Sequence, residues 1–509
     1  MKQVCLISFY LFLLELPLQS LSQGQSDTWC FGDSVTLNLQ SGNFINLPSC
    51  NLNSIESSAS ISDSNGNLIF YAGGYTNSTV SYLKIFSASH QLIQNGDSIK
   101  GDGTVTNGLV ILPFPSDTNK YYLFSIAPTM GFGLHLYYSI IDMSLNSGNG
   151  AVIQKNILLY NQTTLAEKLT AIKHGNGRDW WLITHQLNYT YDTDTFLLYL
   201  ITPNGIAVQN KQNLGTLYSH NYPFNGFTGE IQPSQEGTKL LCVGSDVIDL
   251  FDFNRCTGTL SNYQNLAPAI SPQPPLNGYY GCSFSTDGTK IYISNWHNGL
   301  STNLSYQLFQ LDLLSPNIAS SKTIIFSTTN QNTPLGQHQL ARNGKIYIAS
   351  AYGIPFSNSN YVTQNMNLSV INAPDSLGTT SNFSSYSIPL GGRRSYVGLP
   401  NIPNYNLGAD EGSPCDTLAV VISLPIGERL GVRLFPNPAS NNFTISYTAK
   451  QNLRFTLQNT LGQTILQTTL YTNKNSLSVN TQKLSNGVYF YKITNSELKT
   501  QSGKISVIH

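Results

Sequence analysis

A strand–turn–strand pattern recurs six times between Ser58 and Ile348, and it constrains the fold more than any other feature of the sequence. Each copy has a small or polar start, an alternating strand, a Gly/Asn turn, and then an aromatic or β-branched strand. The turn positions lie 51 to 60 residues apart, at Gly66, Asn119, Gly177, Gly237, Gly288 and Gly344. This period suits a four-stranded antiparallel blade with one longer loop, so the sequence predicts a β-propeller.

The region 27–405 has room for seven blades, because seven blades of about 55 residues need about 385 and the region offers 379. Segments 28–32 and 35–39 have the pattern of a second and a third strand without a first, and 396–402 that of a first strand with nothing after it. Joining them would close a seventh blade and hide the sheet edges that an open ring exposes. A six-bladed ring with frayed ends is the alternative.

The composition agrees with an all-β fold. Hydrophobic residues make up 40% of the 509 and aromatic residues 11%, too many for a disordered chain. The polar remainder is Ser, Thr, Asn and Gln, which favours strands and turns over helices. Since 26 basic residues balance 26 acidic ones, nothing electrostatic points to nucleic acid or an anionic membrane, and we predict no nucleic-acid partner.

The N-terminus is typical of a secretory signal. Lys2 precedes an apolar run from Val4 to Leu18, and small residues follow up to Ser22, after which we expect cleavage. A signal anchor is the alternative, but the run is shorter than the roughly 20 residues of a bilayer span, and Glu15 interrupts it. We therefore predict a signal peptide at 1–22 and no transmembrane segment.

Six cysteines follow the signal, and an even number in an exported chain indicates disulfides. They are Cys30, Cys50, Cys242, Cys256, Cys282 and Cys415. A bond between Cys256 and Cys282 would close a loop of about 26 residues, and Cys242 is the competing partner of Cys256. Zinc is a poorer interpretation because no paired C-x-x-C spacing occurs.

The chain changes character after a linker at 406–429. Residues 430–509 contain short strands with turn signals every 8 to 12 residues, which is typical of a small β-sandwich. This part resembles the C-terminal sorting domain of the type IX secretion system of Bacteroidota. The resemblance rests on Pro436, Asn437 and Pro438, on Leu484, Gly487 and Tyr489, and on the final strand from Lys504 to Val507.

The resemblance implies export to the periplasm and passage through an outer-membrane translocon, with the type IX translocon and sorting machinery as partners. The tail is usually then removed, with release of the protein or attachment to the surface. Residues before 406 resemble uncharacterised β-propeller proteins that often carry such tails, through segments 58–63, 167–171, 253–258 and 391–395. That likeness implies a secreted or cell-surface setting but no reaction.

Three glutamates share one register, just ahead of the innermost strand of three blades, at Glu56, Glu167 and Glu230. In a propeller such positions ring one mouth of the central channel, together with His338, Arg393 and Arg394. We refer to these six residues as the predicted mouth, a candidate ligand-binding site. The competing interpretation is that each glutamate binds loop amides and stabilises a blade junction.

Other chemistry has little support in the sequence. No Gly-x-Ser-x-Gly nucleophile elbow and no H-E-x-x-H metal spacing occurs, so we predict no cofactor and no metal. The function predicted is a secreted or surface-attached, non-enzymatic propeller that binds a glycan or a protein. The alternative is an extracellular hydrolase or lyase at the channel mouth, which would need two carboxylates roughly 5 to 9.5 Å apart in a cleft.

Overall fold

The computed structural model describes residues 24–77, 80–128, 133–220, 226–267, 278–295, 306–329, 334–352, 360–416, 432–435, 439–447, 451–459, 462–495 and 500–507. The predicted signal peptide at 1–22, and Pro436, Asn437 and Pro438 of the sorting motif, lie outside these ranges. Within them the chain is all-β, with 34 strands and the short 3₁₀ turns η1 (Gly24–Ser26), η2 (Asn146–Gly148), η3 (Ala319–Ser321) and η4 (Gly378–Ser381).

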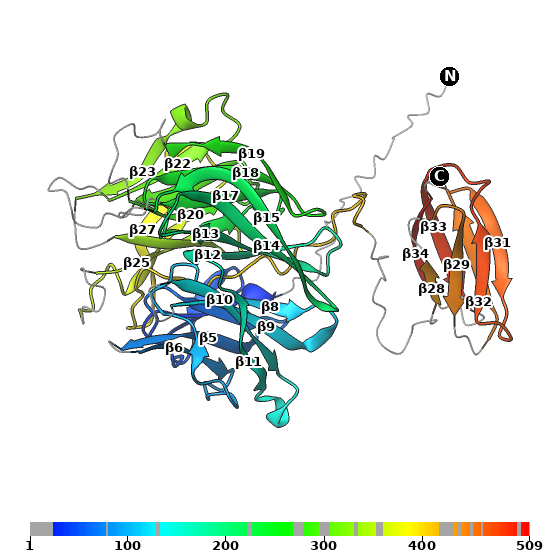
Figure 1. Ribbon diagram of the computed structural model, residues 1–509, viewed down its shortest axis with the longest axis horizontal. Coiled ribbons are helices and arrows are strands. Elements are labelled where there is room, and N and C mark those ends of the chain that lie inside the picture. Colours follow the sequence, from blue (N-terminus) through cyan, green and yellow to red (C-terminus); the bar gives the residue numbers. More distant parts are fainter. Residues whose placement is uncertain are drawn as a thin grey trace, which may run out of the picture.

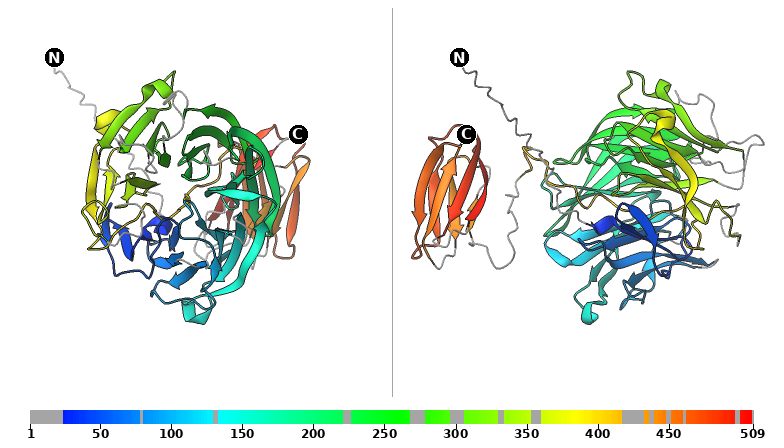
Figure 2. Two further views of the ribbon diagram at one scale, coloured as in Figure 1. Left: turned by 60° about the vertical axis from the view of Figure 1, so that its left-hand side comes forward. Right: turned by 180° about the vertical axis from the view of Figure 1, so that it is seen from behind.

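Seven antiparallel sheets are built from the described residues before 406, and they surround a common centre as in a propeller (Figures 1 and 2). The first has three strands, β1 (Thr28–Phe31), β2 (Val35–Gln40) and β3 (Asn43–Asn46). Two four-stranded sheets follow, β4 (Ser58–Ser62), β5 (Leu68–Asn77), β6 (Val80–Ser87) and β7 (Ile99–Lys100), then β8 (Leu109–Phe114), β9 (Asp117–Pro128), β10 (Leu134–Asp142) and β11 (Ala151–Tyr160).

The other four sheets have the same consecutive strand order, with the first strand innermost. They are β12 (Thr164–Lys173), β13 (Trp180–Leu187), β14 (Thr193–Thr202) and β15 (Gly205–Tyr218); β16 (Ile231–Pro233), β17 (Lys239–Gly244), β18 (Val247–Asn254) and β19 (Thr259–Asn265); β20 (Tyr279–Phe284), β21 (Lys290–Asn295), β22 (Tyr306–Asp312) and β23 (Thr323–Thr328); β24 (Leu335–Leu340), β25 (Ile346–Ser350), β26 (Asn367–Ile371) and β27 (Phe383–Pro389).

Most of the predicted turns lie between the first and second strands of these sheets. Five of the six turn positions are glycines with φ between +68° and +86°, a conformation that costs residues with a Cβ atom energy. The prediction for Asn119 is wrong, because that residue lies inside β9 and the turn comes earlier, where Phe114 pairs with Asp117. The repeat is thus encoded mainly in local backbone requirements.

The prediction that 396–402 forms a strand is wrong. Pro400 forms an isolated bridge with Ser58, and Arg394, just before the segment, forms one with Asp33. Its backbone bonds go to two different neighbours, since Val397 O accepts from Gln337 N at 2.7 Å and Gly398 N donates to Ile55 O at 2.9 Å. The segment lies between two sheets and divides its hydrogen bonds between them. It also contains Pro400, which has no backbone N–H, so it cannot form a continuous ladder with β1. We call residues 390–405 the closing segment.

The tail forms a two-sheet sandwich. One sheet has the order β28-β29-β32 and the other β31-β30-β33-β34. The bounds are β28 (Val432–Phe435), β29 (Asn442–Tyr447), β30 (Leu453–Gln458), β31 (Thr464–Leu470), β32 (Ser476–Asn480), β33 (Gly487–Thr494) and β34 (Thr500–Val507). Apolar side chains such as Phe443, Phe455 and Ile493 fill the space between the sheets.

Residues 406–416 run along the propeller rather than simply leading away from it. Asp410 N donates to Gly175 O at 2.8 Å, and Arg255 donates to Gly408 O. Just before this stretch, the buried Tyr405 hydroxyl donates to Ile111 O at 2.9 Å. The first part of the predicted linker therefore packs on the propeller.

Candidate functional site

The three predicted glutamates lie at the centre of the propeller and are buried. Glu56 and Glu230 come just before the inner strands β4 and β16, as predicted, whereas Glu167 lies within β12, at a bulge between Leu165 and Leu169. Their exposed fractions are 6%, 1% and 8% respectively. The register shared in the sequence thus places all three carboxylates in the interior.

Glu56 and Glu167 come together through one hydroxyl. Thr106, in the segment that leads into β8, donates its Oγ1 to Glu167 Oε2 at 2.8 Å and to Glu56 Oε2 at 3.4 Å. The Thr106 backbone N–H also donates to Glu167 Oε2 at 3.0 Å. Because these residues precede or begin the inner strands of three consecutive sheets, the carboxylates connect one sheet to the next.

Glu230 makes the corresponding connection on the other side of the centre. Its Oε2 accepts the backbone N–H of Cys282 in β20 at 2.8 Å and that of His338 in β24 at 2.9 Å. The Gln232 side chain donates to the second oxygen at 3.3 Å. A single carboxylate therefore satisfies amides of two further inner strands.

A buried lysine accompanies these carboxylates. Lys168, next to Glu167, has an exposed fraction of 0%, and its Nζ donates to the carbonyl oxygens of Thr228, Gly229 and Val243 at 2.6 to 3.0 Å. Burial lowers the pKa of this amine, and the nearby acidic groups partly oppose that effect. We define the buried acidic cluster as Glu56, Thr106, Glu167, Lys168 and Glu230.

Burial dominates the protonation of the carboxyl groups. It raises the pKa of Glu167 to about 7 and that of Glu230 to about 8, against the lowering effect of the hydrogen bonds that they accept. For Glu56, burial and then the charge of Glu167 raise the pKa well above its ordinary value. Such shifts occur in acid–base sites, but they occur equally in buried structural networks.

His338 lies in the same interior, and its contact with the glutamates is made by its backbone N–H, which donates to Glu230. Its exposed fraction is 1%, its Nδ1 lies 3.3 Å from Ser283 Oγ, and burial lowers the pKa of the ring to about 3. The adjacent Gln337 joins the closing segment to the cluster, because its side chain donates to Thr106 O and accepts the Leu399 N–H at 2.7 Å.

The two arginines of the predicted mouth have other partners. Arg393 donates to Ser49 Oγ at 2.8 Å and to Leu47 O at 3.1 Å. Arg394 forms an ion pair with Asp33 at 3.2 Å, and its guanidinium lies over the rings of Tyr361 and Tyr396, 4.6 and 4.9 Å from their centroids. These contacts hold the closing segment against the first sheet.

A pocket lies at the opposite end of the inner strands. It has a volume of about 120 Å³ and is bounded by the last residues of β16, β20 and β24 and by the end of the closing segment. Its polar lining includes Gln232, Ser234, Gln235, Thr286, Gln339 and Asn404. The sequence reasoning missed this pocket, because the lining residues carry no motif.

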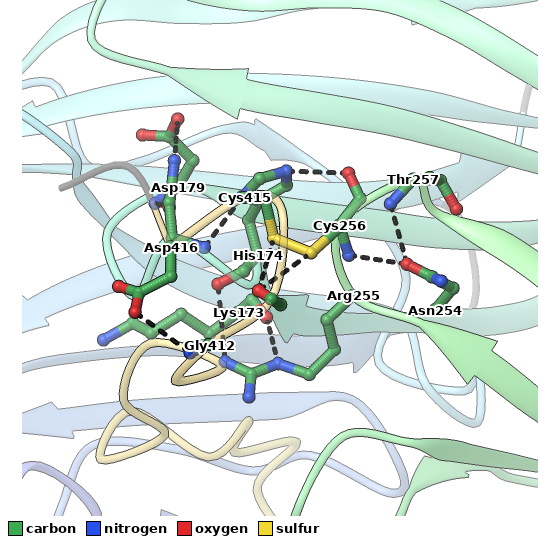
Figure 3. The surroundings of a disulfide bond; sticks show 12 residues. Lys173, His174, Asp179, Asn254, Arg255, Cys256, Thr257, Gly412, Cys415 and Asp416 are labelled. Carbon is green, nitrogen blue, oxygen red and sulfur yellow. Dashed lines mark hydrogen bonds between the residues drawn. A yellow bond between two sulfur atoms is a disulfide. The ribbon is translucent and has the colours of Figure 1, made fainter. Parts of the chain in front are cut away.

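The Cys256–Cys282 prediction is wrong. Cys256 forms a disulfide with Cys415, with the Cα atoms 5.4 Å apart (Figure 3). Cys282 and Cys242 are buried thiols. Cys256 lies in the outer turn between β18 and β19, but Cys282 lies on the innermost strand of the next sheet, so the two differ in depth. The bond instead fixes the end of the 406–416 stretch to the propeller.

The disulfide is surrounded by hydrogen bonds to the propeller (Figure 3). Arg255 Nε donates to Lys173 O at 2.9 Å, and the His174 ring lies 3.0 Å from Cys256 O. Cys256 N donates to Asn254 Oδ1 at 2.9 Å. These contacts hold the Cys256 turn in place.

The described part of the predicted sorting motif lies in the sandwich. Gly487 begins β33, and the largely buried Tyr489 donates its hydroxyl to Ser485 O at 2.9 Å. Lys504 in β34 forms an ion pair with Asp416 at 2.6 Å, next to the disulfide.

Residues 433–508 match the family model of the secretion system C-terminal sorting domain. The match indicates export by the type IX system, to the cell surface or into the medium, and interaction with that secretion machinery. Among the described residues, no helix combines the length and apolar character needed to cross a membrane. No curated protein matches the chain by sequence.

The chain is also similar to solved structures, at low TM-scores. A protein proposed to be a 6-phosphogluconolactonase from Bacteroides fragilis is 11% identical with a TM-score of 0.43, over 75% of this chain and 98% of that one. PorZ, a surface component of the type IX secretion system of Porphyromonas gingivalis, is 12% identical with a TM-score of 0.28, over 95% and 74%. A puromycin hydrolase is 10% identical with a TM-score of 0.37, over 84% and 59%.

Proposed function

We propose that the propeller is a non-enzymatic binding module for a glycan or a protein, delivered outside the cell by its sorting domain. The observation that carries the non-enzymatic part of this proposal is the structural role of the three glutamates. Each one is buried, and each accepts hydrogen bonds from another sheet. Their contacts support the structural alternative for these residues, and the predicted mouth as a ligand site stays a prediction.

The enzymatic alternative needs a carboxylate pair that a substrate can reach. General acid–base catalysis requires hydrogen-bond reach between the side chain and the reacting group. Glu56 and Glu167 have the raised pKa values that suit an acid, but both are buried and bonded to Thr106. This arrangement argues against hydrolysis at these two carboxylates.

The pocket at the other end of the inner strands offers groups suited to a sugar. Amide and hydroxyl side chains such as Gln235, Thr286 and Asn404 can donate to and accept from sugar hydroxyls. Its volume of about 120 Å³ is below the about 300 Å³ of a pocket for a whole drug-sized ligand. It suits the terminal group of a larger ligand that also contacts the surrounding loops.

The test is a screen of the purified, exported protein on a glycan array. We expect retained glycans with one shared terminal sugar, and Gln235→Trp should abolish retention by filling the pocket. Asn204→Trp is the matched control, since Asn204 is an exposed residue in the β14–β15 turn, away from the pocket. Equal loss in both variants would point to misfolding and is checked by the melting temperature.

Two other results would change the proposal. Retention that survives Gln235→Trp but disappears in Arg393→Ala, at unchanged melting temperature, would move the site to the predicted mouth. Chromatography of the retained glycans after incubation tests catalysis. Cleavage products that vanish in a folded Glu230→Gln variant would establish the hydrolase or lyase and overturn the binding proposal.

A further inference from the structure

The residues after β3 run back along the first hairpin of the chain. Leu52 O accepts the Ser34 N–H at 2.9 Å, and Ser54 N donates to Gly32 O at 3.0 Å. Between them, Asn53 forms an isolated bridge with Asp33. The segment 50–54 is thus fixed against the turn between β1 and β2.

This arrangement brings two cysteines together. Cys30 lies in β1 opposite Thr36 of β2, and Cys50 Sγ lies 3.1 Å from the carbonyl oxygen of Val35, the residue before Thr36. Both thiols are at most 1% exposed and share one apolar cluster with Tyr71, and each is close enough to shift the pKa of the other.

The other cysteines are arranged differently. Cys256 is bonded to Cys415, while Cys242 and Cys282 are packed in two different apolar clusters, on either side of the β16–β19 sheet. The sorting domain directs the chain out of the cytoplasm. Disulfides form and persist in the oxidising compartments that the chain then enters. Cys30 and Cys50 are therefore the pair set up for oxidation.

We propose that Cys30 and Cys50 form a second disulfide in the exported protein. The bond joins residues separated by 20 positions and fixes segment 50–54 to the three-stranded sheet. It goes beyond the proposed binding function and does not depend on it.

The chemistry is thiol–disulfide exchange with an oxidised dithiol oxidoreductase of the periplasm, before the cluster closes around the thiols. The Cys50 thiolate attacks one sulfur of the enzyme's disulfide and forms a mixed disulfide. The Cys30 thiolate then attacks Cys50 Sγ and releases the enzyme as a dithiol. Two electrons and the two thiol protons leave the chain, and the oxidant gains the electrons.

The surroundings favour Cys50 as the attacking group. The hydrogen bond from Cys30 lowers the pKa of Cys50, with a further contribution from the charge of Arg393, whereas burial raises the pKa of Cys30. Arg393 also holds Leu47 and Ser49, just before Cys50. The arginine thus stabilises both the segment and the thiolate.

The experiment counts thiols in the exported protein. The protein is unfolded in guanidinium without reductant, treated with iodoacetamide, weighed intact and digested without reduction. We expect two carbamidomethyl groups, on Cys242 and Cys282, and one cross-linked peptide containing Cys30 and Cys50. Four groups, with Cys30 and Cys50 both labelled, would overturn the proposal, as would a cross-link from either one to another cysteine.

Two single variants check the assignment. Cys30→Ser should expose Cys50 and raise the number of labels to three, whereas the control Cys242→Ser should lower it to one. An unchanged count in Cys30→Ser would contradict the bond. If Cys30→Ser does not accumulate, the wild-type peptide map alone decides.

Discussion

The propeller and the sorting domain solve the problem of a β core in different ways. The propeller buries Glu56, Glu167, Lys168 and Glu230 at its centre. In the described part of the sandwich, the buried polar side chains are Thr481 and Asn495, and the core between the sheets is apolar. Two sheets packed face to face interdigitate apolar side chains, and their strand amides pair within each sheet.

At the propeller centre, by contrast, the inner strands of different sheets converge, and the amides facing the centre lack a strand to pair with. Buried amides must find acceptors, and the glutamates supply them. We therefore expect the propeller to depend on pH and on its cross-links, and the sandwich to depend on neither.

Removing the sandwich should abolish export and leave the propeller intact. A chain that stops after residue 428 keeps the Cys256–Cys415 disulfide but lacks the matched sorting domain. We expect the truncated protein to accumulate in the periplasm with an unchanged propeller melting temperature. Cell fractionation measures the first and calorimetry the second. Normal surface levels of the truncated protein would show that the sandwich is not the export signal.

Glu230→Ala should destabilise the propeller by about 2–5 kcal/mol, because the buried amides of Cys282 and His338 lose their acceptor. Urea unfolding followed by tryptophan fluorescence reports this directly, since all four tryptophans precede residue 406. The matched control is Glu236→Ala, an exposed glutamate in the turn after β16, which should change the free energy of unfolding by about 0.5 kcal/mol or less. Equal changes in the free energy of unfolding in the two variants would contradict the structural role of Glu230.

The sequence predicted what short-range geometry determines. The period of the turn glycines located the first hairpin of five sheets, because a positive φ is a local requirement. The predicted register of Glu56 and Glu230 was also correct. The pairing of Cys256 with Cys282 was predicted wrongly, since its partner Cys415 lies 159 residues away and is brought close only when 406–416 packs on the propeller.

The roles of Thr106, Lys168 and Gln337 were missed for a related reason. Each bonds the backbone or a side chain of another sheet or of the closing segment, so its function exists only in the closed ring. Thr and Gln are common in this chain and carry no spacing that marks such a role.

Cys415→Ser should lower the free energy of unfolding of the propeller by about 2–4 kcal/mol, because the reduced chain gains entropy mainly in the unfolded state. The transition of the sandwich should not move, and Cys282→Ser, which removes a buried thiol that is in no disulfide of the structure, serves as the control. Calorimetry of the full chain separates the two transitions. A shift in the sandwich transition alone would show that the disulfide stabilises the tail.

The smallest expected effect is a loss of propeller stability between pH 6.5 and 7.5. In the folded state the pKa of Glu230 is about 8, above the about 4.3 of an unfolded glutamate. The folded state therefore binds more protons in this range, and stability falls as the pH rises, by about 1 kcal/mol per pH unit. Glu167, with a pKa of about 7, contributes in the same direction.

The range from pH 6.5 to 7.5 lies above most of the opposing effect of the buried histidines. Burial lowers the pKa of His185 and His338 to about 3. An unfolded histidine has a pKa of about 6.5, so the folded state binds fewer protons at these two residues between these values, and stability rises with pH there. Lys173, whose pKa burial lowers to about 8, acts mainly above the range. Burial also lowers the pKa of Lys168, which opposes the fall in stability. The variant Glu230→Gln keeps the size of the side chain and cannot ionise. It should flatten the pH dependence measured by urea unfolding, and an unchanged slope in this variant would mean that Glu230 is ionised in the folded protein throughout the range.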